Sequence, residues 1–288
     1  MKISRLASLA TLLASLLLLS GCPATLTPET ADLQHVHELY ATEFTLLDDA
    51  ITSVGETSTA KKTSSGDAFL QSLRAINDYR ARHPDKSLEL AHLDVLEGMI
   101  FLQSGRFGLA RAVAPNVEKA ATTLRSANPP RQSATGAAST SRTVRDALFA
   151  QNFPALLDGW SATRDGTSTP ETFETAARAI AKNLGESSSV LNRDHGALYL
   201  ATSAAIFYAW AHARDSNHVN LDPSDDKLRE LEQRRLQRYT AARDLLAGFL
   251  TDAERTVRLA DELGNEIPRG RLRYAQWYHF FNDALAGR

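Results

Sequence analysis

The sequence predicts an all-α fold, and three observations support this prediction. Ala and Leu are abundant whereas runs of β-branched residues are scarce, which favours helix over strand. Apolar residues recur at steps of three and four along most of the chain, as expected for one buried stripe on each helix. Proline and glycine interrupt this pattern and so predict where helices end. We therefore expect antiparallel helical hairpins, arranged as an α-solenoid or as an irregular helical bundle.

The first element, residues 1–21, has the pattern of a bacterial signal peptide. Lys2 and Arg5 form a positive start, and the apolar run that follows is too short to span a bilayer. The run ends in an aliphatic residue, two small residues and a cysteine: Leu19-Ser20-Gly21-Cys22. Small residues fit this place because a signal peptidase grips an extended backbone just before the bond that it cleaves.

This ending resembles the lipobox of bacterial lipoprotein precursors. The resemblance implies that residues 1–21 are removed and that Cys22 becomes the lipid attachment site, with acyl chains such as palmitate. Each buried CH₂ adds about 0.8 kcal/mol of membrane affinity, so several chains anchor a protein without a transmembrane helix. Pro23 stands where lipoproteins retained in the inner membrane tend to have Asp, which favours the outer membrane. An ordinary secretory peptide with an incidental cysteine is the alternative.

Composition limits what the rest of the chain can be. The 288 residues include 32 basic and 34 acidic side chains, so no basic excess is present to attract nucleic acid. Cys22 is the only cysteine, so the chain has no internal disulfide, and its lipidation would leave no thiol for chemistry. Hydrophobic residues make up 43% of the chain, which indicates a packed globule.

Residues 22–124 are predicted to form an N-terminal helical region. A hydroxyl, a proline and an acid at Thr27-Pro28-Glu29 indicate a helix start, and Gly55 ends the stripe that follows. Residues 56–66 form a polar loop, and His83-Pro84 stops the next helix. Ser104-Gly105 is predicted to be a tight turn. The expected helices span residues 28–54, 67–82, 87–103 and 107–124.

The hairpin over residues 87–124 resembles a tetratricopeptide repeat. The match consists of a small residue, an aromatic, a turn glycine, a second aromatic and a second small residue: Gly98, Phe101, Gly105, Phe107 and Ala110. The resemblance implies that Gly98 and Ala110 let the two helices approach closely. Asp94, Glu97 and Ala114 depart from the repeat pattern, and no similar recurrence follows. Any antiparallel helix pair with a glycine turn is the alternative.

Residues 125–143 are small and polar without an apolar face. They predict either a linker between two domains or a long surface loop within one. A C-terminal helical bundle is expected over residues 144–288.

The elements of this bundle are predicted in order. Two short helices over 144–151 and 154–162 precede a helix that starts at Pro170 and ends at Gly185. Residues 197–213 are apolar on nearly every face, which predicts a central, buried helix. The run over 223–264 is one helix or two joined near Gly248, and a final helix follows Pro268.

No residue pattern points to catalysis, a metal or a cofactor. The sequence contains none of the local motifs of serine hydrolases, zinc proteases or phosphate-binding loops. His35 and His37 point to different sides of a helix and cannot share an ion, and His212 and His218 are interpreted as residues at a loop rim. The aromatic cluster over 277–281 indicates core packing or a contact surface.

We therefore expect a non-enzymatic lipoprotein of the bacterial cell envelope, anchored in the outer membrane and facing the periplasm. Grooves of stacked hairpins commonly receive a peptide or a helix, so the expected role is a protein-interaction scaffold in envelope assembly or transport. The alternative is a small-molecule-binding accessory lipoprotein of a solute transport system. A pocket lined by aromatics from 199–210 and 274–281 would favour that alternative. An enzyme without a local motif, such as a cell-wall hydrolase, is a third hypothesis.

Overall fold

The computed structural model describes residues 31–41, 69–127, 142–191, 195–221, 224–256 and 269–287. Every regular element in these ranges is a helix and none is a strand, so the predicted all-α fold is confirmed. The chain divides into two compact units, Met1–His83 and Pro84–Arg288, and each is described by itself.

The first unit contains a helix over residues 31–41 and helix α3, Leu70–Arg82. The rings of Tyr40 and Phe69 stack with their centroids 5.6 Å apart, and Phe69 is fully buried. At the other end of α3, Asp32 Oδ2 lies 2.6 Å from Arg82 Nη1 and 2.9 Å from His83 Nε2. Helix α3 ends just before His83, as predicted from the proline that follows.

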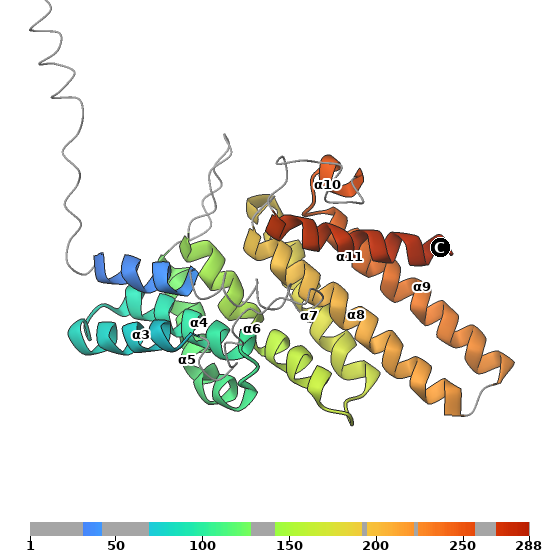
Figure 1. Cartoon of the computed structure of the whole chain (residues 1–288), viewed down its shortest axis with the longest axis horizontal. Coiled ribbons are helices and arrows are strands. Elements are labelled where there is room, and N and C mark those ends of the chain that lie inside the picture. The colour runs from blue at the N-terminus through green and yellow to red at the C-terminus, as the bar shows by residue number, and fades with distance from the viewer. Residues whose placement is uncertain are drawn as a thin grey trace, which may run out of the picture. The chain divides into compact units, whose positions relative to one another are not determined.

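The second unit contains the remaining helices (Figure 1). They are α4 Ser87–Gln103, α5 Phe107–Ala127, α6 Arg142–Arg164, α7 Pro170–Leu191, α8 His195–Leu221, α9 Asp225–Ala247, α10 Asp252–Thr256 and α11 Arg269–Leu285. Each helix from α4 to α8 packs against the next one along the chain. Short turns join α4 to α5 and α6 to α7, which makes both pairs antiparallel hairpins.

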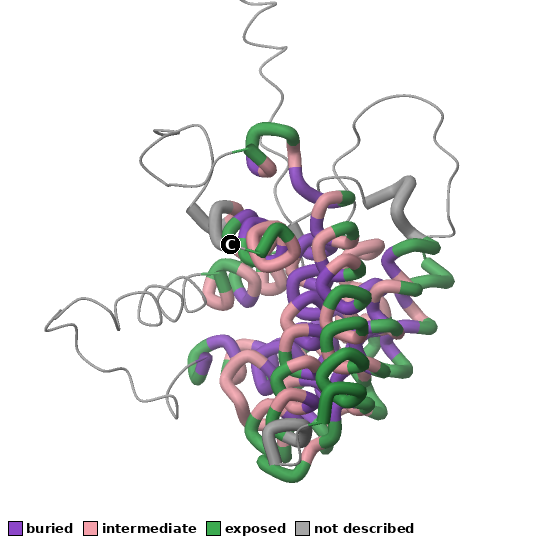
Figure 2. The backbone as a smooth tube through the Cα atoms, turned by 90° about the vertical axis from the view of Figure 1, so that its right-hand side faces the viewer, coloured by how far each residue is buried: buried purple, intermediate pink, exposed green. Residues whose placement is uncertain are grey.

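The hairpins α4–α5, α6–α7 and α8–α9 are stacked through their first helices. Helix α4 contacts α6, and α6 contacts α8. Helix α11 then packs against both α9 and α8 and closes this end of the stack. Figure 2 shows buried positions where the helices face one another and exposed positions on their outer sides. The unit is therefore built as consecutive hairpins, the arrangement of an α-solenoid.

Two glycines mark the points where the first helices of successive hairpins meet. A Cβ atom at Gly98 of α4 would lie 2.8 Å from Val117 of α5 and 2.9 Å from Phe153 of α6. A Cβ atom at Gly159 of α6 would lie 2.2 Å from the ring of Phe207 of α8. The predicted close approach at Gly98 is thus confirmed. The same glycine-to-phenylalanine contact recurs one hairpin later, where the sequence showed no repeat.

The turn between α4 and α5 is closed by the backbone. Arg106 N–H donates to the carbonyl of Phe101 at 2.8 Å, and Gly105 N–H donates to that of Leu102 at 3.0 Å. Gly105 has a φ of 70°, a left-handed conformation that side chains with a Cβ rarely adopt. The predicted turn at Ser104-Gly105 is confirmed.

Two predicted helix breaks, at Pro154 and Gly185, are wrong. The two short helices expected over 144–151 and 154–162 form the single helix α6, with Pro154 in its interior. Pro154 is exposed, and burial of Phe153 and Leu156 beside it holds the helix together despite the missing N–H. Helix α7 also continues past Gly185 to Leu191, because a glycine within a helix costs only about 1 kcal/mol relative to alanine.

The C-terminal helices match the remaining predictions in most respects. Helix α8 contains the predicted buried stretch, and residues such as Leu198, Ala201 and Phe207 are fully buried. Helix α9 ends at Ala247 with Gly248 as its C-cap, so the run divides near that glycine. His212 lies within α8 and not at a loop rim, because α8 extends beyond residue 213, where the apolar pattern stops.

The segment over 125–143 lies within the second unit. Helix α5 continues to Ala127 and α6 begins at Arg142, while residues 128–141 lie outside the described ranges. Helices α5 and α6 pack against each other. The linker and the surface loop both stay predictions for this segment.

Candidate binding groove

The groove is formed on the hairpin of α6 and α7. The turn between them is held by Asp165, whose Oδ1 accepts hydrogen bonds from the Thr167 N–H at 2.9 Å and the Thr167 hydroxyl at 2.7 Å. Helix α7 then starts at Pro170, as its sequence predicts. The two helices face each other through small side chains, which leave space that larger residues would fill.

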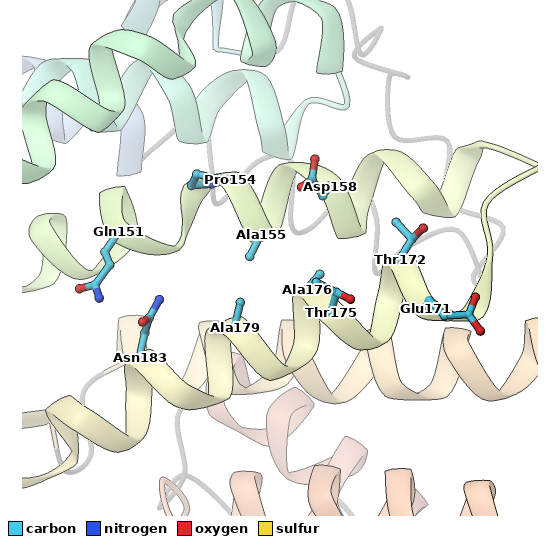
Figure 3. Close-up of a pocket in the computed structure, with 10 residues that line it drawn as sticks. All are labelled: Gln151, Pro154, Ala155, Asp158, Glu171, Thr172, Thr175, Ala176, Ala179 and Asn183. Atoms are coloured by element: carbon cyan, nitrogen blue, oxygen red, sulfur yellow. The ribbon is translucent and has the colours of Figure 1, made fainter.

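Ten residues line this space, which we name the hairpin groove (Figure 3). They are Gln151, Pro154, Ala155, Asp158, Glu171, Thr172, Thr175, Ala176, Ala179 and Asn183, and the open space that they line measures about 520 Å³. Ala155 and Ala179 point toward each other from the two helices, as do Gln151 and Asn183 at one end. The groove thus has an apolar middle and polar ends, in the size range of ligand sites.

A second hollow of about 310 Å³ adjoins the hairpin groove near the α6–α7 turn. Asp158 and Thr172 line both spaces. Arg111 of α5 lines only the second hollow, and its Nη2 donates to Ser161 Oγ at 3.0 Å. Its guanidinium is therefore already engaged beside the groove.

The charges that line the hairpin groove are both negative. The Glu171 carboxylate accepts hydrogen bonds from its own N–H and from Thr169, which lowers the pKa of Glu171 and keeps it ionised at neutral pH. Arg238 and Arg234 of α9 add to this effect. Asp158 is exposed and has no ion-pair partner among the residues that the structure describes.

A buried ion cluster holds α7 in place against its neighbours. Arg238 of α9, only 5% exposed, bonds to Asp215 of α8 and donates to Glu174 Oε2 of α7 at 2.9 Å. Burial by itself would lower the pKa of Arg238, but the two carboxylates outweigh it and raise this pKa above its ordinary value. Because the cluster joins three helices, it positions the α7 wall of the hairpin groove.

A second polar contact joins α4 to α6. His92 Nδ1 lies 2.6 Å from Asp146 Oδ2, and His92 is buried. Neither residue belongs to a recognisable motif, because the helix stripe shows only that position 92 lies among apolar residues. No pattern along the chain pairs it with a residue on another helix.

The sequence predicts a single site residue, Cys22, and rejects the histidines as shared metal ligands. Cys22 lies outside the described residues, so lipid attachment stays a prediction. His35 is exposed whereas His37 is half-buried, on one helix. His212 packs edge-on against Tyr239 of α9, with ring centroids 5.4 Å apart. Burial lowers the pKa of His212, and repulsion from nearby arginines lowers it further.

The aromatic cluster over 277–281 divides between core and surface. Phe281 is fully buried and meets the Tyr239 ring at 5.2 Å, which confirms core packing for this residue. Phe280 remains 46% exposed. The hairpin groove is lined by neither this cluster nor residues 199–210, which were expected to line a small-molecule pocket.

The described residues offer few groups for chemistry. They contain no group of three or more His, Cys, Asp or Glu side chains that could hold a metal ion. Burial raises the pKa of Tyr199 to about 12, so its phenol stays neutral. No helix within the described ranges is both long and apolar enough to cross a bilayer.

The fold and groove define an all-α protein of stacked helical hairpins. Comparison with protein-family models, curated proteins and solved structures finds no match to the chain.

Proposed function

We propose that the chain is a lipid-anchored scaffold of the bacterial envelope that binds a segment of a partner protein in the hairpin groove. The anchor would be Cys22, at the end of a signal peptide over residues 1–21, in the outer membrane and facing the periplasm. The lipobox residues support this part of the proposal, since they combine a basic start, an apolar run and a cysteine at the expected distance.

The single observation that carries the binding role is the unfilled groove on a rigid hairpin stack. Stacked hairpins offer long surfaces whose residues come from several helices, and such surfaces commonly bind peptides. Here the groove is lined by alanines that leave room for another chain, with polar groups at both ends. The buried Arg238 cluster fixes α7, so the groove is formed before a partner arrives.

Lipid attachment is tested by metabolic labelling with an alkyne fatty acid. The unaltered chain is expected to incorporate the label, and Cys22→Ala is expected to abolish it. Labelling that persists in Cys22→Ala would contradict the lipobox assignment.

The scaffold role is tested by crosslinking the lipidated chain in its own envelope and purifying it. A protein recovered in stoichiometric amount supports the proposal. A co-purifying metabolite without a protein partner would favour the small-molecule-binding lipoprotein of a transport system. Turnover of a substrate by the pure protein would favour an enzyme and contradict both.

A further inference from the structure

The side chains around the hairpin groove restrict the charge of what it can bind. Asp158 and Glu171 bring two carboxylates, while no Lys, Arg or His side chain is among the ten lining residues. Glu171 is held in its ionised form by the hydrogen bonds at the start of α7. An acidic ligand would be repelled here, whereas a cationic group would find two opposite charges.

The opposite end of the groove offers hydrogen-bonding side chains. Gln151 and Asn183 extend toward each other across it. Asn183 Nδ2 donates to the buried Asn152 Oδ1 at 2.9 Å, which fixes how its amide is oriented. Side-chain amides offer both donors and acceptors, so they can bind the N–H and C=O groups of a polypeptide backbone.

The distance between the two ends sets the length of the occupant. Asn183 and Glu171 are separated by about 18 Å along α7, at 1.5 Å per helical residue. About five residues of extended chain cover this distance at 3.3 Å each. Ala155, Ala176 and Ala179 lie between the ends and allow a backbone to approach closely.

An extended segment fits these groups better than a helix does. The backbone N–H and C=O groups of a helix are bonded to one another, so the amide pair would gain no backbone partner from it. The backbone groups of an extended segment are free on both sides.

We propose that the hairpin groove binds an extended segment of a partner protein that places a lysine or arginine beside Asp158 and Glu171. This inference rests on the proposed scaffold role and adds the chemistry of the partner. The segment spans the alanines, and its backbone is bound at the Gln151–Asn183 end.

The test uses fluorescein-labelled hexapeptides of Gly, Ala and Ser with one Lys, Arg or Glu at each position in turn. Binding to the full lipidated chain in detergent micelles is followed by fluorescence anisotropy. Peptides with Lys or Arg near one end are expected to bind, and binding is expected to weaken as salt is added. Equal binding of the Glu peptides, or none of any peptide, would overturn the inference.

Two variants test the site directly. Asp158→Asn with Glu171→Gln is expected to weaken binding of the basic peptides about fivefold, as for two solvent-exposed charge pairs. The matched control is Glu186→Gln with Asp226→Asn, which removes two exposed carboxylates outside the groove and is expected to leave binding unchanged. Equal weakening in both variants would show a general charge effect and overturn the inference.

A second variant fills the groove without changing charge. Ala155→Met with Ala179→Met is expected to abolish peptide binding while the helical circular dichroism persists. If this variant does not fold, the charge variant alone decides the question. Free spermidine, a small polycation, is added as a competitor of the labelled peptides. If spermidine binds at the groove and the peptides do not, the site takes small cations and the inference fails.

The failure of this inference can be told apart from failure of the scaffold role. If the charge variant still crosslinks to the same envelope partner as the unaltered chain does, the scaffold role stands and the groove is not its site. If the unaltered chain crosslinks to no protein, the scaffold role fails.

Discussion

Replacing Gly159 with alanine tests the packing that joins the second and third hairpins. The added Cβ atom would lie 2.2 Å from two ring carbons of Phe207. Carbon atoms in contact are about 3.5–4.0 Å apart, so the ring or the helix must move by more than about 1 Å. Phe207 is fully buried and has no solvent into which it can turn.

Two opposing effects set the size of the change. Overpacking a close-packed interior costs about 1–3 kcal/mol. Gly→Ala within a helix stabilises by about 1 kcal/mol, because alanine has less backbone entropy to lose. The clash with the buried ring places the packing cost in the upper part of its range, so we expect a net loss of roughly 1 kcal/mol and at most about 2 kcal/mol. A loss of this size lowers Tm by about 4 °C in a unit of this length.

The measurement is thermal unfolding followed by circular dichroism, with Gly185→Ala as the control. Gly185 lies within α7, and a Cβ atom there would meet nothing within 4 Å. The control is therefore expected to gain up to about 1 kcal/mol from helix propensity alone. Adding Phe207→Leu to Gly159→Ala should recover part of the loss, because the smaller side chain makes room.

The reasoning is refuted if Gly159→Ala raises Tm as Gly185→Ala does. The predicted clash is also refuted if Phe207→Leu lowers the free energy of unfolding equally in the unaltered chain and in Gly159→Ala, since two residues in contact must show coupling.

The remaining predictions concern buried charges and their titration. Arg238→Met should lower the free energy of unfolding by about 3 kcal/mol, measured in urea, because it leaves the buried Asp215 with only the longer contact to Arg234 at 3.6 Å. Burial would raise the pKa of Glu254, but Arg271 and the Thr251 N–H outweigh it and lower this pKa. The ionised Glu254 therefore stabilises the fold above the unfolded pKa of 4.5, and this stabilisation is lost as pH falls through the lower folded pKa. Glu254→Gln should make the free energy of unfolding, measured at several pH values, fall less steeply in acid. The pKa of His212 is lowered in the fold, so the folded state prefers the neutral ring. The free energy of unfolding should therefore decline as pH falls below about 6.5, and His212→Gln should reduce this decline.

Local signals in the sequence predicted most helix boundaries correctly. The ends at Arg82 and Ala247, the start at Pro170 and the turn at Gly105 follow from proline and glycine, whose backbone preferences act within a few residues. The two wrongly predicted breaks have one cause. Inside a helix, Pro154 costs about 3 kcal/mol and Gly185 about 1 kcal/mol, and burial of neighbouring side chains against other helices outweighs these costs.

The hairpin groove could not be predicted in the same way. Ala176 belongs to a helix stripe that looks like an ordinary core position, and no pattern in the sequence shows that Ala155 and Ala179 face an open space. The recurrence of Gly98 with Phe153 and Gly159 with Phe207 was also hidden, because each pair is separated by more than forty positions in the printed sequence.

The sequence by itself determined that the chain is helical, where most of its helices begin and end, and which stretch is apolar on every side. These properties depend on interactions between residues a few positions apart. Only the tertiary structure decided which helices meet, that His92 pairs with Asp146, and that Arg238 lies buried between two carboxylates. Such contacts join residues from different helices, and the free energy that selects them comes from packing the helices together.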